Sequence, residues 1–259
     1  MRKLLLFSSI FILGINVFAQ NGNTITISGQ VTDFDGNPID SCLVRLCRKN
    51  FSSVYVTYSE KTGYYTLKDV EKGYYMALMA IRPEEYPRPV FVKADEVVSD
   101  EKKRLEYWAW NVIADKDLTI NPRYGRLELY GFQVFEVFGG TPYLMAYVRP
   151  GSLGKMLSFD QKEWSDKKKM EKTVDVSVEA KDIEFKIYAG DEQLSIHSIQ
   201  TLDEYVGDSI PTFRGFFLQF DRPKEFSDNY CIFRIEATHK LFGEEKGENV
   251  YFYELKDYK

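Results

Sequence analysis

The stretch that decides the fold is Thr24-Ile25-Thr26-Ile27-Ser28-Gly29-Gln30-Val31-Thr32. Its apolar residues recur at every second position, which is the period of a half-buried β-strand. Residues 33–38 follow with two aspartates, a glycine, an asparagine and a proline. Glycine takes positive φ without strain, and aspartate side chains hydrogen-bond the local backbone. The stretch therefore predicts a strand that ends in a tight turn.

Four more strand-like segments follow at even spacing, with no helical period between them. They lie at residues 42–46, 54–58, 64–67 and 74–81. Glycine-containing turns precede the last two, at Gly63 and Gly73. Short strands at this spacing are typical of a small antiparallel β-sandwich.

These segments share an ordered set of motifs. They are Gly29-x-Val31-x-Asp33, Asp35-Gly36-x-Pro38-Ile39, Val44-x-Leu46, Thr62-Gly63-x-Tyr65-x-Leu67 and Gly73-x-Tyr75. Over about residues 24–92 the chain resembles the carboxypeptidase regulatory-like domain. The resemblance implies a seven-stranded prealbumin-like β-sandwich that acts as a structural or interaction module without catalytic residues. Cys42 replaces a small residue of the family, and residues 82–87 replace the usual glycine-aromatic end of the fifth strand.

A charged stretch at residues 93–104 is expected to form a linker or one short exposed helix. Further strand patterns lie at residues 105–113, 126–138, 143–148, 173–178, 183–188, 213–220, 231–237 and 249–255. Seven or eight strands over residues 105–259 suit a second β-sandwich of immunoglobulin or fibronectin type. The sequence therefore predicts an all-β chain built from two tandem β-sandwiches.

The N-terminus has the three-part layout of a secretory signal peptide at residues 1–19. Arg2 and Lys3 precede an apolar run that ends at Val17, and Ala19 stands at the expected cleavage site. The run is too short to span a bilayer comfortably. We expect export to the periplasm, the outer surface or the medium, with no stable membrane span after the signal is removed.

The charge of the chain argues against nucleic acid as a partner. Its net charge is −5 and becomes −7 without Arg2 and Lys3. The basic run at residues 167–169 is flanked by Asp166 and Glu171. An acidic surface repels phosphate backbones, so nucleic-acid binding is not expected.

The residues that bind metals or form disulfides are few. Cys42, Cys47 and Cys231 are an odd set, and their surroundings favour buried free thiols. His197 and His239 lie on or beside strand patterns and are expected at the surface. Neither H-E-x-x-H nor C-x-x-C occurs, so no metal site and no cofactor are predicted.

Three motifs resemble catalytic or calcium-binding sites only in part. Ser152 lies between glycines, but their spacing differs from a serine elbow and no strand-to-helix turn is expected there. Ser209 stands in a late loop rather than after the first strand of an α/β fold. A calcium loop starting at Asp33 needs glutamate at its twelfth position, where Val44 stands. We expect Asp33 and Asp35 to cap the turn instead.

Trp108 and Trp110 are the one specific lead to a ligand. Strand parity places them on one face and Tyr107 on the other. Exposed, the two indoles would form a platform for sugar rings; buried, they would belong to the core, which is the more common place for tryptophan. The core position is the expectation.

Taken together, these patterns favour a non-catalytic exported binding or accessory protein. Its partner would be a glycan or a protein of the cell envelope. The alternative is a hydrolase of envelope polymer or polysaccharide that uses a pair of carboxylates on the second domain. The sequence spacing singles out no such pair.

Overall fold

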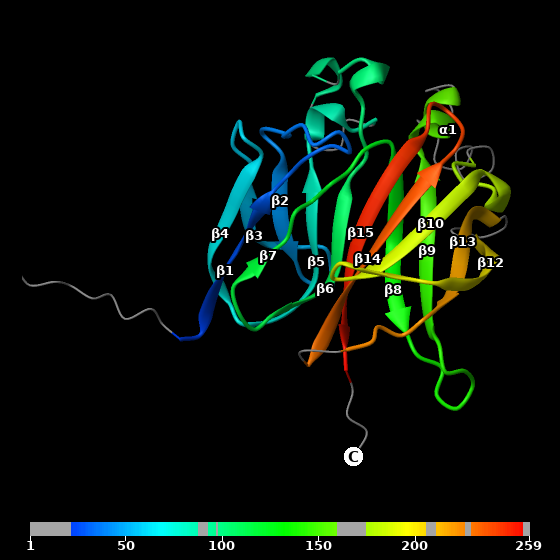
Figure 1. Ribbon diagram of the computed structural model, residues 1–259. Helices are drawn as coiled ribbons and strands as arrows, with labels where there is room; N and C mark the ends of the chain where they lie inside the picture. The colour runs from blue at the N-terminus through cyan, green and yellow to red at the C-terminus, as the bar shows by residue number, and fades with distance from the viewer. Residues whose placement is uncertain are drawn as a thin grey trace, which may run out of the picture.

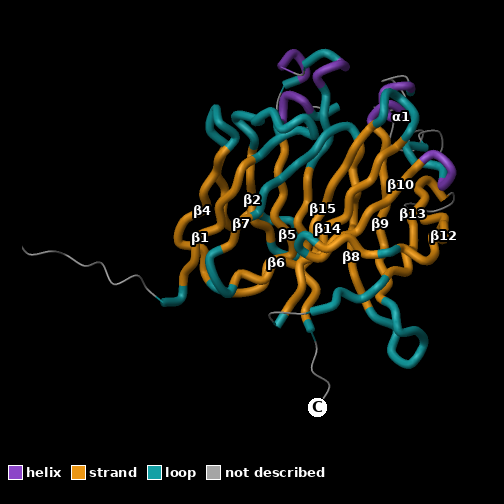
Figure 2. Tube along the Cα trace, in the orientation of Figure 1, coloured by secondary structure: helices purple, strands orange, loops and turns teal. Residues whose placement is uncertain are grey.

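The computed structural model describes residues 22–87, 93–96, 98–159, 175–205, 211–225 and 229–255. Almost all regular structure in them is β-strand, so the expected all-β class is confirmed (Figures 1 and 2). The expected signal peptide at residues 1–19 lies outside the described residues.

The strands form three sheets. A three-stranded sheet has the order β4-β1-β7, an eight-stranded sheet β11-β10-β14-β15-β6-β5-β2-β3, and a four-stranded sheet β12-β13-β9-β8. The first seven strands are β1 (Thr24–Gln30), β2 (Leu43–Cys47), β3 (Ser53–Tyr58), β4 (Tyr64–Glu71), β5 (Gly73–Ile81), β6 (Tyr107–Ala114) and β7 (Leu118–Thr119). The others are β8 (Leu127–Phe135), β9 (Leu144–Ser152), β10 (Ile183–Ala189), β11 (Glu192–Leu194), β12 (Ile196–Tyr205), β13 (Pro211–Phe220), β14 (Tyr230–His239) and β15 (Glu245–Glu254).

Helical structure in the described residues is short. The helix α1 covers Leu153–Ser158 directly after β9. Single 3-10 turns lie at Pro83–Glu85, Ala94–Glu96, Asp100–Lys102 and Ala180–Asp182. Of the expected strand at residues 173–178, the described part holds only an isolated bridge between Ser177 and Gly151. The strand β12 contains the strand pattern expected around His197, whereas β11 was not expected.

The large sheet carries core clusters on both of its faces. One core lies between the three-stranded sheet and β2, β5 and β6, and it includes Ile27, Val44 and Tyr107. A second lies between the four-stranded sheet and β10 and β14, and it includes Phe216 and Phe233. A third includes Met79 on β5, Trp108 on β6 and Leu153 on α1. In Figure 1 the long strands β14 and β15 run through the middle of the molecule. Burial on both faces explains why several strands are apolar at successive positions.

The strand that we expected to open the second sandwich is placed elsewhere. β6 pairs along its length with β5, and Tyr107, Ala109 and Val112 pack into the first core. β7 then pairs with β1. The described part of residues 24–92 holds five strands, β1 to β5, and the sixth and seventh strands of the chain follow up to Thr119. No break in the large sheet marks the expected boundary, because β6 also pairs with β15.

The expected linker at residues 93–104 is attached to the first half. The backbone N–H of Arg104 donates a hydrogen bond to the backbone O of Glu85 at 3.0 Å. The Arg104 guanidinium also lies 2.7 Å from the Glu85 carboxylate. Lys103 forms an ion pair with Asp100 within the segment. These contacts connect the 3-10 turns to the end of β5 rather than leaving a free spacer.

A buried asparagine joins the two halves where their strands meet. β15 and β6 run parallel and share two residue pairs. Asn249 on β15 is fully buried; its Oδ1 accepts from Trp108 N–H at 3.1 Å, and its Nδ2 donates to Leu129 O on β8. Asn111 on β6 donates to Phe252 O at 2.7 Å. The two amide side chains thus provide hydrogen-bond partners for backbone groups that the short β15–β6 pairing leaves without one.

Candidate functional site

The two tryptophans that the sequence singled out are stacked on each other. Their ring centroids lie 4.7 Å apart with an interplanar angle of 13°, and Tyr130 meets both rings edge-on. Trp108 is 4% exposed, and Phe51 covers it further at 6.0 Å. Trp110 is half-buried and packs against the same cluster. The pair does not form an open platform for a sugar ring.

Ser152 and His239 meet at a buried glutamate. Ser152 Oγ donates to Glu245 Oε2 at 2.5 Å, His239 Nδ1 lies 3.1 Å from the same oxygen, and Gly154 N–H donates to Oε1 at 2.6 Å. Ser152 also caps α1 by accepting from Lys155 N–H. Two expectations are therefore wrong: His239 is buried, and a strand-to-helix turn does occur at Ser152.

This cluster does not have the arrangement of a catalytic triad. In a triad the histidine lies between serine and carboxylate, where it can take the serine proton. Here Glu245 lies between Ser152 and His239, and all three side chains are buried. The arrangement anchors the start of α1 to the β14–β15 hairpin.

Asp33 caps its turn, as expected. Its Oδ1 accepts from the backbone N–H groups of Asp35 and Asn37 at 2.9 Å each. Burial acts to raise the pKa of Asp33, but hydrogen bonds from Asn37 and Asp35 and the charge of Arg104 lower it, and the pKa lies below its usual value. Within the described residues no group of three or more His, Cys, Asp or Glu side chains is placed to hold a metal ion.

The best candidate for a ligand site is a cleft of about 600 Å³ between the end of β8 and the end of β15, here named the β8–β15 cleft. This volume lies in the range of small-ligand pockets. Its lining combines aromatic rings with amides and charged groups: Asn111, Gln133, Val134, Phe135, Glu136, Phe138, Arg222, Tyr251, Tyr253, Glu254 and Leu255. Phe138 in the β8–β9 loop is 62% exposed.

Ion pairs and hydrogen bonds hold the wall of the cleft in place. Arg222, which follows β13, pairs with Glu136 and donates from Nε to Pro142 O at 2.9 Å. The Tyr253 hydroxyl lies 3.4 Å from Glu136 Oε2. Burial raises the pKa of Tyr253 and the charge of Glu136 raises it further, so the hydroxyl stays a donor at neutral pH. Arg222 thereby fixes both ends of the β8–β9 loop.

One residue of the cleft lining, Tyr251, lies next to the tryptophan pair. Tyr251 is the neighbour of Trp110 across the β15–β6 pairing and packs edge-on to Phe132 at 6.3 Å. Burial raises the pKa of Tyr251, and its hydrogen bond with Gln133 lowers it in part. Asn111 is held at φ 54°, a left-handed conformation that is uncommon within a strand. Strain of this kind often lies at functional sites.

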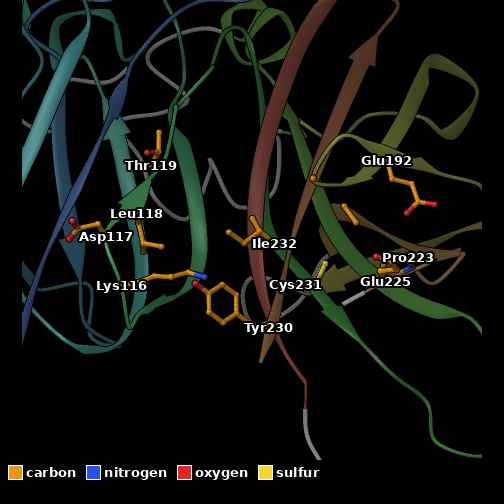
Figure 3. Close-up of a pocket in the computed structure, with 12 residues that line it drawn as sticks. Lys116, Asp117, Leu118, Thr119, Glu192, Pro223, Glu225, Tyr230, Cys231 and Ile232 are labelled. Atoms are coloured by element: carbon orange, nitrogen blue, oxygen red, sulfur yellow. The ribbon is translucent and has the colours of Figure 1, made fainter. Parts of the chain in front are cut away.

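A smaller pocket of about 340 Å³ lies between the β6–β7 loop, the β10–β11 turn and β14 (Figure 3). At its edge the Tyr230 hydroxyl lies 3.1 Å from Asp115 Oδ1, and Lys116 Nζ lies 5.6 Å from the Tyr230 ring centroid. Burial raises the pKa of Cys231 to about 11, and Glu192 adds to the effect. The thiol is therefore protonated at neutral pH and is a poor nucleophile.

The sequence signals for the β8–β15 cleft are weak. Residues 126–138 form one of the strand patterns, and their apolar side chains at both parities are typical of a strand covered on two sides. Nothing in the spacing connected Glu136 with Arg222, Tyr253 or Glu254, since they are far apart in the chain. The aromatic alternation of β15 was a usable signal, because Tyr251 and Tyr253 share a face opposite the buried Phe252.

Comparisons with known proteins give weak similarities. No protein-family model matches the chain, and no curated protein matches it. Among solved structures, a DUF3823 family protein from Bacteroides ovatus is 11% identical, with a TM-score of 0.27, and the match covers 90% of this chain and 100% of that one. The major pilin subunit of Bacillus cereus is 8% identical, with a TM-score of 0.26 and coverages of 88% and 69%. The major pilin SpaD from Corynebacterium diphtheriae is 8% identical, with a TM-score of 0.25 and coverages of 89% and 66%.

Identities and TM-scores this low support no inference about family or function. The resemblance to the carboxypeptidase regulatory-like domain stays a prediction from the residues. Within the described part of the chain, none of the helices is long and apolar enough to cross a bilayer.

Proposed function

We propose that this protein is an exported, non-catalytic binding protein that recognises a glycan in the β8–β15 cleft. The observation that carries the proposal is the convergence of four aromatic rings with amide, carboxylate and guanidinium groups in one cleft. Aromatic faces complement the C–H faces of sugar rings, and the polar groups suit sugar hydroxyls. The wall is held by Arg222 before any ligand arrives, which lowers the cost of ordering on binding.

The test uses the full mature chain on an array of oligosaccharides, followed by calorimetry on the strongest hit. Phe138→Ala should weaken that hit at least tenfold, because the ring is exposed at the mouth of the cleft. Tyr58→Ala is the matched control, since Tyr58 is 60% exposed on β3, outside the cleft lining. Absence of any glycan hit, or equal losses in both variants, would contradict the proposal.

A hydrolase is the second candidate, because Glu136 and Glu254 line the same cleft. Glycoside hydrolysis needs one carboxyl group that donates a proton and one that stays ionised. Arg222 contacts Oε1 of Glu136 and the Tyr253 hydroxyl contacts Oε2, so both carboxylate oxygens already have partners in the wall of the cleft. Hydrolysis of a bound oligosaccharide that is lost in both Glu136→Gln and Glu254→Gln would reverse the preference.

An envelope protein as partner is favoured by a different surface. β3 is one of the two edge strands of the eight-stranded sheet, carries no charged residue and exposes Val56 and Tyr58. Edge strands without charge pair readily with another chain. Val56→Lys should remove capture of a protein from envelope extracts, whereas Ile199→Lys on the edge strand β12 should not.

A further inference from the structure

The charges in the β8–β15 cleft do not cancel. Glu136 and Arg222 pair with each other. Glu254 accepts a hydrogen bond from the Tyr74 hydroxyl at 2.8 Å, and the described residues place no cationic side chain in an ion pair with it. Among the described residues, the carboxylate of Glu254 therefore has no positive partner in the cleft.

The remaining polar groups near Glu254 also accept hydrogen bonds. Asn111 uses one Nδ2–H to donate to Phe252 O, and its Oδ1 is left as an acceptor for a ligand. A carboxylate is an acceptor at both oxygens. A ligand that supplies donors therefore suits this end of the cleft, and a positive charge among the donors would be favoured.

The aromatic lining adds a second attraction for a cation. Phe135, Phe138, Tyr251 and Tyr253 line the same cleft. The negative faces of aromatic rings attract ammonium groups, most strongly where water is partly excluded. Rings combined with an unpaired carboxylate are the chemistry that recognises a protonated amine.

We infer that the glycan bound by the β8–β15 cleft carries a protonated amine, as a deacetylated amino sugar does, and that Glu254 receives the ammonium group. The inference rests on the proposed function and specifies its ligand class. The ammonium supplies three N–H donors to the acceptor-rich end, while the sugar ring packs on the aromatic side chains. The acidic net charge of the chain favours the approach of such a cation.

The experiment compares two hexamers of the same sugar backbone, N-acetylglucosamine and glucosamine, by calorimetry at a pH where the free amines are protonated. We expect the glucosamine hexamer to bind at least about tenfold more tightly, as a charge-assisted hydrogen bond typically gives. Glu254→Gln should reduce this ratio to about threefold or less. Glu184→Gln on β10 removes the same charge from an exposed position outside the cleft lining and should leave the ratio unchanged.

Each outcome decides a different point. Equal binding of both hexamers, lost in Phe138→Ala, would overturn the amine inference and leave the glycan proposal standing. A preference that persists in Glu254→Gln would also overturn the inference, because the selecting charge would then lie elsewhere. Binding of neither hexamer, with no other glycan hit, would remove both proposals.

Discussion

Replacing Asn249 with alanine should destabilise the whole chain, since this side chain connects three strands. Its Oδ1 accepts from Trp108 N–H on β6, and its Nδ2 donates to Leu129 O on β8. The residue is fully buried, so water cannot replace the lost partners. Leaving one buried donor or acceptor unpaired costs about 1–3 kcal/mol. Two such groups give a loss of about 2–6 kcal/mol.

Urea unfolding of the mature chain, followed by tryptophan fluorescence, measures this loss. The expected loss is large compared with the free energy of unfolding of a typical domain, which is ~5–15 kcal/mol. Asn249→Asp separates the two bonds, because the carboxylate keeps an acceptor for Trp108 but no longer donates to Leu129. Gln200→Ala, at an exposed position on β12, is the control and should change stability by no more than about 0.5 kcal/mol. A loss below about 1 kcal/mol for Asn249→Ala would refute the bridging role.

Three further predictions concern Trp108, Asp33 and two of the cysteines. Trp108→Ala should cost about 3–5 kcal/mol and clearly lower the melting temperature, because it empties a large buried site; an unchanged melting curve would contradict the core position. The pKa of Asp33 lies below its ordinary 3.8, so its contribution to stability is present above pH 3.8 and is lost as the pH falls through the lower folded value. Comparing wild type with Asp33→Asn across this acid range tests the sign, and a difference that does not shrink on acidification would contradict it. Burial raises the pKa of Cys42 to about 12 and of Cys231 to about 11, so iodoacetamide should label both slowly in the native chain and rapidly after unfolding.

The sequence was most reliable where the signal is local. Alternation predicted β1, and the spacing of turn formers predicted the Asp33 cap. The parity that placed Trp108 and Trp110 on one face agrees with their stacking at 4.7 Å. These features depend on neighbours within a few residues, and the period of a strand transmits them directly to the structure.

The sequence was least reliable where the partner is distant. The boundary at residues 93–104 follows a change in charge, yet β6 beyond it pairs with β5 before it. His239 stands beside Lys240 and reads as a surface residue, but Glu245 draws it into a buried cluster with Ser152. Which strands are adjacent, and which polar groups become buried together, depends on packing that no local pattern contains.

The amino-acid sequence by itself determined an all-β chain, the positions of most of its strands and its acidic charge, because composition and alternation act over a few residues. Only the tertiary structure decided that one eight-stranded sheet runs through both halves, and that β8 and β15 end beside each other. Glu136, Arg222, Tyr253 and Glu254 meet in one cleft for that reason. The physical cause is that hydrophobic burial selects which sheets face each other, and the side chains at their ends are brought together as a consequence.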